Sequence, residues 1–253
     1  MGIPCHRRLD ILKIQAEYHR DVLKPSLMLH GINLIFFMVG TDQLEREVLP
    51  IDDKVFIYEE HPQNILSLKF NRLLEFGKEI GCDAVMTMGS DDLIPPSLFL
   101  EMVKIALDNT LISTPTQMII HDVYSKKAYI WKGYGPSRVL GLGAGRVYTK
   151  KLLNLLPPKP FGEGLAVNCE EGNVDPKIYK AIHESNLDAR KIKVSGCYPL
   201  DNQLLSLKAK SALNSLYVFL DRKLVEDRVL DINDETIFGW VSKPILKQIL
   251  ELK

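Results

Sequence analysis

Hydrophobic positions along the first 108 residues alternate between helical spacing and short continuous runs. Residues 7–23 carry apolar side chains three and four positions apart, and residues 64–80 repeat this pattern, so both segments are predicted to be amphipathic helices. Residues 32–39 instead form an apolar run rich in β-branched and aromatic residues, which predicts a strand buried on both faces. Residues 54–58 and 83–88 predict two further strands.

Residues typical of helix ends stand where these patterns change. Asn64 is expected to be the N-cap of the second helix, Gly81 its glycine stop, and Pro95 with Pro96 the first turn of a third helix. With residues 2–5 as the stub of a first strand, strands and helices alternate. This order predicts an α/β fold with a mixed, mostly parallel sheet flanked by helices.

Ligands of such folds bind beyond the carboxyl ends of the strands. Residues 6–8 follow the first strand and residues 89–92 follow the strand at 83–88, so the two loops are expected to face one crevice.

The second half of the chain is predicted in less detail. Residues 111–131 indicate β-structure with a turn at 125–127, and Thr149 is expected to begin a short helix. Residues 206–253 show helical spacing and little strand signal. We therefore expect a first domain over 1–205 and a helical C-terminal extension over 206–253.

Composition narrows the class of protein. The 253 residues are 46% hydrophobic and 25% charged, which excludes a disordered or fibrous chain. The longest apolar run is far shorter than a membrane span, and the N-terminal residues lack the pattern of a signal peptide, so we expect a soluble, cytoplasmic protein. The four cysteines show no CxxC spacing and indicate neither a zinc ribbon nor a disulfide framework. Because 32 basic residues balance 32 acidic ones, no general field for nucleic acid is predicted.

The segment most informative about chemistry is Ser90-Asp91-Asp92. A buried strand that ends in adjacent aspartates, followed by a helix that begins with proline, places two carboxylates at the rim of a sheet. Carboxylates beside a ligand crevice are suitable ligands for Mg²⁺ or Mn²⁺, which share their coordination shell with substrate phosphates. The alternative is that both aspartates only cap the helix or form an Asx turn, and the pattern leaves the two interpretations about even.

Four segments in order resemble a known family. They are Ile-Pro-Cys-His-Arg-Arg at 3–8, a βαβ unit, Lys-Phe-Asn-Arg at 69–72, and Gly-Ser-Asp-Asp-Leu-Ile-Pro-Pro at 89–96. This succession resembles the nucleotide-sugar glycosyltransferases of GT-A fold, especially the family-2-like group, over 3–108 and only loosely beyond. The resemblance implies a Rossmann-like GT-A fold and a metal-dependent enzyme of the hexosyltransferase kind. Such an enzyme moves a sugar from a nucleoside diphosphate to an acceptor hydroxyl with Mn²⁺ or Mg²⁺.

The resemblance also implies functional residues. It places the donor near the ends of the first strands, on the following helix and at the aspartate motif: Pro4, His6, Arg7, Asp42 with Gly40 and Thr41 before it, Lys69, Asn71, Arg72, Ser90 and Asp91. Asp91 and Asp92 would hold the metal. For Lys69 and Arg72, which are three residues apart, a solvated basic face is the alternative. The chain departs from the family at Gly89, where a first aspartate is usual, and in its very short first strand.

The acceptor side is less defined. Members that invert the anomeric centre supply a carboxylate base about eighty residues after the metal motif, and the carboxylates near that distance are Glu163, Glu170, Glu171 and Asp175. We favour Glu171 or Asp175 as the base, with a solvated loop carboxylate as the alternative for each. Arg146 is a further candidate donor contact, Trp131 and Tyr134 are candidate stacking residues, and His183 is a candidate metal ligand. For each of these four a structural role is the alternative.

The acceptor is expected to be a glycan or another hydroxyl compound, with a modified base in DNA kept as an alternative; sequence does not indicate the oligomeric state. Two other functions remain open. One is a nucleotidyltransferase of related fold, although residues 1–8 lack its glycine-rich phosphate loop. The other is a non-catalytic relative that binds a sugar nucleotide or glycan, which Gly89 suggests.

Overall fold

The computed structural model describes residues 1–50, 55–108, 111–115, 117–131, 144–162, 192–194, 204–208 and 225–252. The helices are α1 (Leu9–Tyr18), the π-helix η1 (His19–Leu23), α2 (Lys24–Met28), α3 (Gln43–Glu47), α4 (Leu66–Glu79), α5 (Pro96–Leu107), α6 (Lys150–Leu155), α9 (Glu235–Phe238) and α10 (Lys243–Glu251). The strands are β1 (Gly2–Pro4), β2 (Phe36–Gly40), β3 (Phe56–Glu60), β4 (Ala84–Thr87), β5 (Asp92–Leu93), β6 (Ile112–Thr114), β7 (Met118–Asp122), β8 (Lys127–Trp131), β9 (Arg146–Thr149), β10 (Ile192–Val194), β11 (Leu204–Lys208) and β12 (Val225–Leu230).

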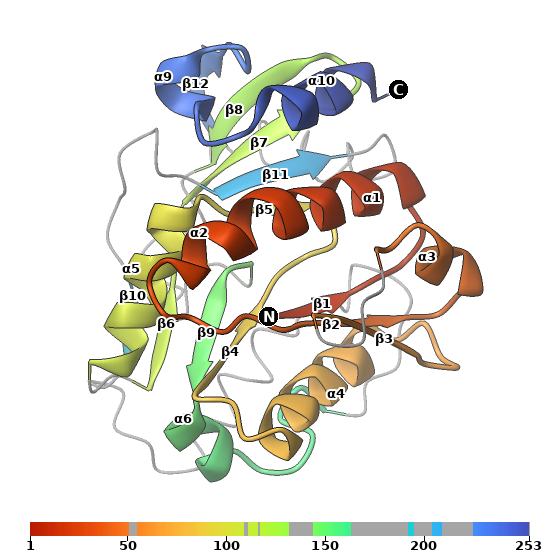
Figure 1. The fold of residues 1–253 in the computed structure, drawn as a ribbon, viewed down its shortest axis with the longest axis vertical. Coiled ribbons are helices and arrows are strands. Elements are labelled where there is room, and N and C mark those ends of the chain that lie inside the picture. Colours follow the sequence, from red (N-terminus) through yellow and green to blue (C-terminus); the bar gives the residue numbers. More distant parts are fainter. Residues whose placement is uncertain are drawn as a thin grey trace.

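The larger sheet has the strand order β10-β6-β9-β4-β1-β2-β3. Strand β1 runs parallel to both β2 and β4, β2 runs parallel to β3, and β9 runs antiparallel to both of its neighbours. In Figure 1, α1 and α2 lie above this sheet and α4 and α6 lie below it. The predicted fold class, a mixed and mostly parallel α/β sheet flanked by helices, is confirmed.

Strand β2 explains the apolar run in the sequence. Phe36 and Met38 belong to the hydrophobic cluster above the sheet, whereas Phe37 and Val39 pack with Leu73 of α4 below it. Because both faces are covered, successive residues of the strand are apolar rather than alternating with polar ones. Helix α4 approaches closely on this side, since a Cβ on Gly77 would stand 2.1 Å from Val85 Cγ2.

The first helical segment is longer than the periodicity predicts. It continues from α1 through the π-helical turn η1 into α2 and ends at Met28 rather than near residue 23. Proline removes one helical hydrogen bond and crowds the carbonyl four residues before it. The wider turn just ahead of Pro25, with its bond from Lys24 N to His19 O, accommodates this residue without ending the helix.

The ends of α4 test two predictions. Gly81 takes a φ of 71° directly after the helix, as expected for a glycine stop. The predicted N-cap at Asn64 is wrong, because the N-cap residue is Ile65 and has no side-chain bond to the helix. The Asn64 carboxamide oxygen instead accepts a hydrogen bond from Lys69 Nζ at 3.1 Å.

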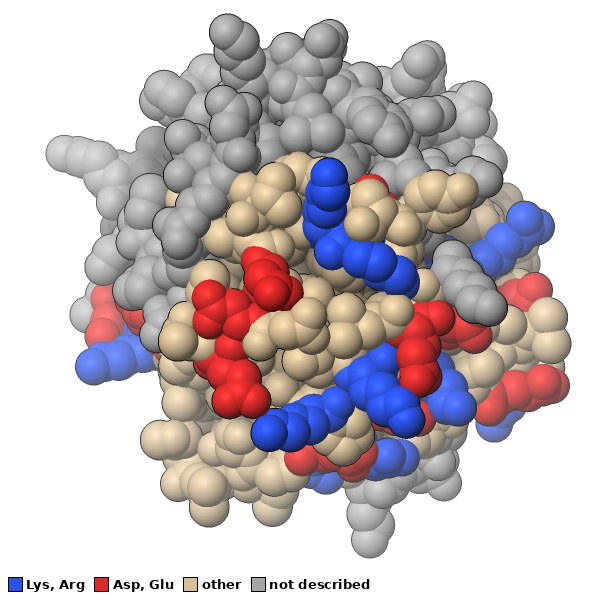
Figure 2. Space-filling model, turned by 90° about the horizontal axis from the view of Figure 1, so that it is seen from above, with Lys and Arg blue, Asp and Glu red and all other residues tan. Residues whose placement is uncertain are grey.

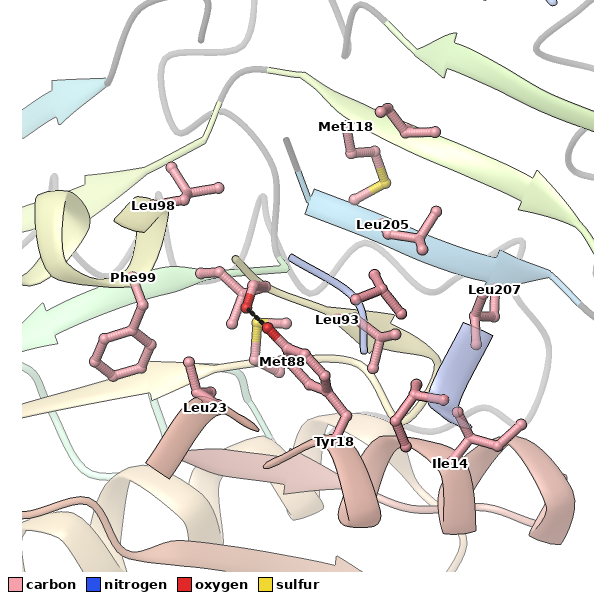
Figure 3. Packing of buried hydrophobic residues seen from close by; sticks show 14 of the residues in the cluster. Ile14, Tyr18, Leu23, Met88, Leu93, Leu98, Phe99, Met118, Leu205 and Leu207 are labelled. Atoms are coloured by element: carbon pink, nitrogen blue, oxygen red, sulfur yellow. Dashed lines mark hydrogen bonds between the residues drawn. The ribbon is translucent and has the colours of Figure 1, made fainter. Parts of the chain in front are cut away.

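A second sheet, of order β12-β8-β7-β11-β5, lies beyond α1. Within 206–253, where the sequence predicts helices, the structure describes α9 and α10 but also β12 and the greater part of β11, which are strands of this sheet. The signal missed in β11 is a two-residue alternation, since Leu205 and Leu207 are both fully buried. Figure 3 shows them with Leu93 in the core that faces Ile14 and Tyr18 of α1.

The surface of the described residues mixes both signs of charge. In Figure 2, which views the molecule from above, basic and acidic side chains stand beside one another rather than forming a large field of one sign. None of the helices within the described ranges combines the length and the apolar character that crossing a membrane requires.

Candidate functional site

The candidate site lies where the order of the strands reverses, at the carboxyl ends of β1 and β4. Ligands of open α/β sheets bind at such a point. The loops that follow β1 and β4 meet here, because Arg8 Nη1 donates to Asp91 Oδ2 at 2.7 Å and Arg8 Nη2 donates to Ser90 Oγ at 3.2 Å. The prediction that residues 6–8 and 89–92 face one crevice is therefore confirmed.

The loop after β1 has an unusual backbone. Arg7 and Arg8 both take left-handed conformations, with φ values of 52° and 54°. This region is unfavourable for residues other than glycine and persists only where surrounding contacts hold it. Glu45 provides such a contact, because its Oε1 accepts a hydrogen bond from Arg7 N at 2.6 Å.

Glu45 joins the loops after β1 and β2 to strand β3. The residue is fully buried, and its Oε2 accepts bonds from Thr41 N at 2.9 Å and from the Tyr58 hydroxyl at 3.1 Å. A Cβ on Gly40 would stand 2.1 Å from both this Oε2 and the Tyr58 hydroxyl oxygen, so glycine is required there. The carboxylate thereby fixes the loop after β1 relative to β2 and β3.

Lys69 supports the same loop from α4. Its Nζ donates to the Cys5 carbonyl and to Asn64 Oδ1, and the residue is only 1% exposed. Burial lowers the pKa of Lys69. His6 lies on the outer side of the loop, with Nδ1 3.3 Å from Thr41 Oγ1, and partial desolvation followed by the charge of Lys69 lowers its pKa. Lys69 and His6 thus both lie at the loop after β1, Lys69 on its buried side and His6 on its exposed side.

The turn after β4 is held from three directions. Within the turn, Gly89 N donates to Asp92 Oδ2 at 3.0 Å. From α1, the buried Gln15 donates through Nε2 to the carbonyls of Gly89 and Asp92, at 2.5 and 2.7 Å. From β11, Leu207 N donates to the Asp91 carbonyl at 2.7 Å. These bonds fix the backbone of the turn, and with it the positions of the Asp91 and Asp92 side chains.

Gly89 explains how the two carboxylates are arranged. A Cβ on this residue would stand 2.5 Å from Asp92 Oδ2 and 2.8 Å from Asp91 Oδ1, so both oxygens converge over the glycine and no side chain fits there. Two convergent carboxylates are a suitable partial ligand set for Mg²⁺ or Mn²⁺ when substrate phosphate and water complete the shell. The described residues hold no cluster of three or more His, Cys, Asp or Glu side chains for a metal.

Three other predicted donor-binding residues have structural roles. Asp42 caps α3 by accepting from Leu44 N at 2.9 Å, and Pro4 is buried as the last residue of β1. Asn71 fixes the chain beyond α6, accepting from Phe161 N at 3.0 Å and donating to the Gly162 carbonyl at 2.8 Å.

Arg72 points away from the site. It pairs with Glu59 at 2.8 Å and with Glu79 at 3.0 Å and lies over the ring of Phe37. The predicted shared face of Lys69 and Arg72 is therefore divided between a buried lysine and an arginine paired at the surface.

The predicted acceptor-side residues are mostly outside the described part of the chain. This holds for Glu163, Glu170, Glu171 and Asp175, and for Tyr134 and His183. Trp131 is described and lies buried at the end of β8, which agrees with core packing. Arg146 is 1% exposed and lies in β9 opposite Thr87, in a strand that the glycine-rich sequence before it did not indicate.

Sequence patterns placed Arg8 only as one residue of the loop 6–8, and they did not identify Gln15 and Glu45. Gln15 offers one signal in retrospect, because it is a polar residue between the apolar positions Ile14 and Ala16 on a helix that is buried along this side. Arg8 and Glu45 carry no local signal, since each acts through a partner more than thirty residues away.

Two hollows among the described residues lie away from this site. One, of about 490 Å³, is lined mainly by apolar residues at the amino ends of β1 and β4. The other, of about 710 Å³, lies between α4 and the segment 153–160. Neither is lined by Arg8 or Asp91, so the site is identified by its chemistry rather than by the size of a cavity.

No protein-family model and no curated protein matches this sequence. Among solved structures, one similar chain is a CMP:2-keto-3-deoxy-manno-octonic acid synthetase complexed with CTP, with 11% identity, a TM-score of 0.45, and 88% of this chain and 98% of that chain covered. Another is a 4-diphosphocytidyl-2C-methyl-D-erythritol synthase from Anaerococcus prevotii DSM 20548, with 13% identity, a TM-score of 0.49, and coverages of 87% and 96%.

Proposed function

We propose that this chain is a metal-assisted transferase that moves a sugar from a nucleoside diphosphate to an acceptor hydroxyl. The observation that carries the proposal is the convergence of Asp91 Oδ1 and Asp92 Oδ2 over Gly89, with the Arg8 guanidinium beside them at the carboxyl ends of β1 and β4. A nucleotide diphosphate brought in with a divalent cation meets both of its needs there, ligands for the metal and a cation for phosphate oxygens.

Charged side chains of both signs meet at this edge of the sheet, among them Arg7, Arg8, Lys69, Glu45 and Asp91. A divalent cation bound here adds positive charge, and the two phosphates of a nucleotide sugar supply negative charge that offsets it.

The chain's own residues then divide the work of transfer. The loop after β1 orients the diphosphate, and the turn after β4 fixes the carboxylates so that no reorganisation is needed during reaction. A divalent cation, when bound, supplies Lewis-acid stabilisation of the charge that develops on the leaving diphosphate. The acceptor oxygen forms a bond to C1 of the sugar as the bond from C1 to the diphosphate oxygen breaks. Its proton passes to a carboxylate base, for which Glu171 and Asp175 remain the predictions.

The test is Asp91→Asn, with Asp83→Asn as the matched control. Asp83 is exposed just before the other end of the same strand, so the control makes the same chemical change away from the site. Thermal unfolding is measured with UDP-, GDP- and dTDP-sugars, with CTP and other triphosphates, and with and without Mn²⁺. One nucleotide sugar at a hundred times its Kd should stabilise the native protein and Asp83→Asn by about 2.7 kcal/mol with Mn²⁺.

Asp91→Asn should lose that stabilisation and the release of nucleoside diphosphate, while its melting temperature without ligand shows that it folds. Unchanged turnover in Asp91→Asn would overturn the assignment of the site. A flat response of the native protein to every nucleotide would overturn the proposed function.

Nucleotidyl transfer is the second candidate, and a specific observation favours it. The loop after β1 lacks the glycines of a phosphate-binding loop, yet Arg7 and Arg8 adopt the left-handed backbone that glycine normally supplies. Stabilisation by a triphosphate alone, with release of inorganic diphosphate on turnover, would select this function over sugar transfer.

A further inference from the structure

We propose that Arg8 is a resident counter-ion of Asp91, which gives way to the divalent cation and turns to the phosphates of the incoming nucleotide. The contact of Arg8 with phosphate rests on the proposed function, whereas the replacement of Arg8 by a divalent cation at Asp91 concerns the metal site alone. Arg8 would then couple the binding of metal to the binding of nucleotide.

The two partners of the ion pair differ in how exposed and how firmly held they are. The Arg8 side chain is 30% exposed, whereas the Asp91 side chain is 8% exposed and comes from a turn held by Gln15 and Leu207. The carboxylate is therefore the fixed partner and the guanidinium the one with room to move. Its second bond, to the Ser90 hydroxyl, is longer at 3.2 Å and ends on a neutral group, so it holds the guanidinium less firmly than the 2.7 Å bond to the carboxylate.

An arginine at position 8 does not stabilise the helix that follows it. Arg8 is the N-cap residue of α1 and makes no side-chain bond to the helix. A cation at a helix N-terminus faces the positive end of the helix dipole, where Asp, Asn, Ser or Thr is favoured. The left-handed backbone of Arg7 and Arg8 is a further local cost. The side chain of Arg8 instead donates to Asp91 and Ser90, which points to a role at that carboxylate.

A guanidinium on Asp91 and a cation shared by Asp91 and Asp92 repel each other. Arg8 therefore weakens metal binding as long as it stays on Asp91 Oδ2. A diphosphate removes this conflict, because its oxygens can accept hydrogen bonds from the guanidinium in place of the single bond that Asp91 accepts. Metal and nucleotide should consequently strengthen each other's binding by the same factor, and Arg8 should carry that coupling.

The experiment measures Mn²⁺ binding to the full chain by calorimetry and by electron paramagnetic resonance. The variants are Arg8→Gln, Arg8→Lys and the matched control Arg20→Gln, which breaks an exposed Arg–Asp pair of 2.6 Å to Asp21. Without nucleotide, Arg8→Gln should bind Mn²⁺ about tenfold more tightly than the native protein, because the competing charge is gone. Arg8→Lys, which keeps the charge, and Arg20→Gln should stay close to the native affinity.

The second measurement repeats the titration with UDP or GDP present. The nucleotide should tighten Mn²⁺ binding to the native protein, and this gain should fall by about tenfold in Arg8→Gln. Thermal melts of each variant confirm that it is folded. If Arg8→Gln binds Mn²⁺ no more tightly than the native protein, or if neither binds it, the inference is overturned. If Arg8→Gln gains Mn²⁺ affinity but no nucleotide binds to any variant, the exchange at Asp91 stands and the proposed function fails.

Discussion

Gly89 offers a direct test of how closely the two carboxylates approach each other. We compare three replacements at this position, Ala, Asn and Asp. All three place a Cβ within 2.5 Å of Asp92 Oδ2 and 2.8 Å of Asp91 Oδ1 unless the carboxylates move. Asn and Asp have the same shape, so the difference between those two variants isolates the effect of a third negative charge.

The magnitude follows from these distances. Alanine has to displace a carboxylate that is held by the amide of residue 89, which overpacks the turn and should cost about 1–3 kcal/mol. Two unit charges about 4 Å apart interact by about 4 kcal/mol at an effective dielectric constant of about 20. Because the Arg8 guanidinium offsets part of the charge on Asp91, we expect Gly89→Asp to be about 2–3 kcal/mol less stable than Gly89→Asn at neutral pH.

The assay is thermal and urea unfolding of the three variants with and without Mn²⁺. For a chain of this size, the expected difference is a melting temperature about 5–10 °C lower for Gly89→Asp than for Gly89→Asn. Mn²⁺ should reduce this difference, since a cation neutralises the added charge, and so should acid, since protonation removes it. If Gly89→Asp without metal is as stable as Gly89→Asn, the two carboxylates do not converge as described and the argument for the metal site fails.

The remaining predictions concern buried polar residues of α1 and η1. Gln15→Met keeps the side-chain volume but removes the donor to two carbonyls of the turn after β4. In urea unfolding it should lower the free energy of unfolding by about 1–3 kcal/mol, and it should also weaken Mn²⁺ binding. A loss of stability without any change in Mn²⁺ affinity would show that the turn holds its shape without Gln15. Burial lowers the pKa of His19 from 6.5 to about 3. Between these two pH values the unfolded chain binds a proton that the folded protein excludes. The free energy of unfolding should therefore fall by about 1.4 kcal/mol per pH unit as the pH drops from 6.5 toward 3. His19→Phe should show a shallower decline over that window in pH-dependent unfolding, and identical slopes for the two proteins would contradict the assignment.

Local patterns were sufficient for the elements whose signal lies in neighbouring residues. The apolar run at 32–39, the glycine stop at Gly81 and the proline start at Pro96 all depend on burial or backbone freedom at one place, and each marks an element of the structure. Strand β9 was missed because its neighbours β4 and β6 are far away in sequence and cover it on both sides. The place of β9 in the sheet therefore depends on its pairing with these two distant strands, which its own residues do not reveal.

The same distinction separates the site residues. Asp91 and Asp92 were identified because a strand, a turn and a proline follow one another directly. Arg8 was placed in the loop 6–8 but not singled out, since His6, Arg7 and Arg8 are adjacent polar residues and only the left-handed backbone decides which of them reaches Asp91. That backbone depends on Glu45, whose role appears only when the loops after β1 and β2 and strand β3 are brought together.

The C-terminal part of the chain contacts the turn after β4 through strand β11 and supports it through helix α10, which packs on α1. The predicted boundary at residue 205 passes through β11, whose Leu207 amide binds the Asp91 carbonyl and whose pairing with β5 includes Asp92. Helix α10 packs against α1, with Gln248 donating to Glu17 at 2.7 Å, and α1 carries the Gln15 that binds the same turn. A change in the last fifty residues can therefore alter the position of the two carboxylates without touching them, which a freely appended helical extension would not do.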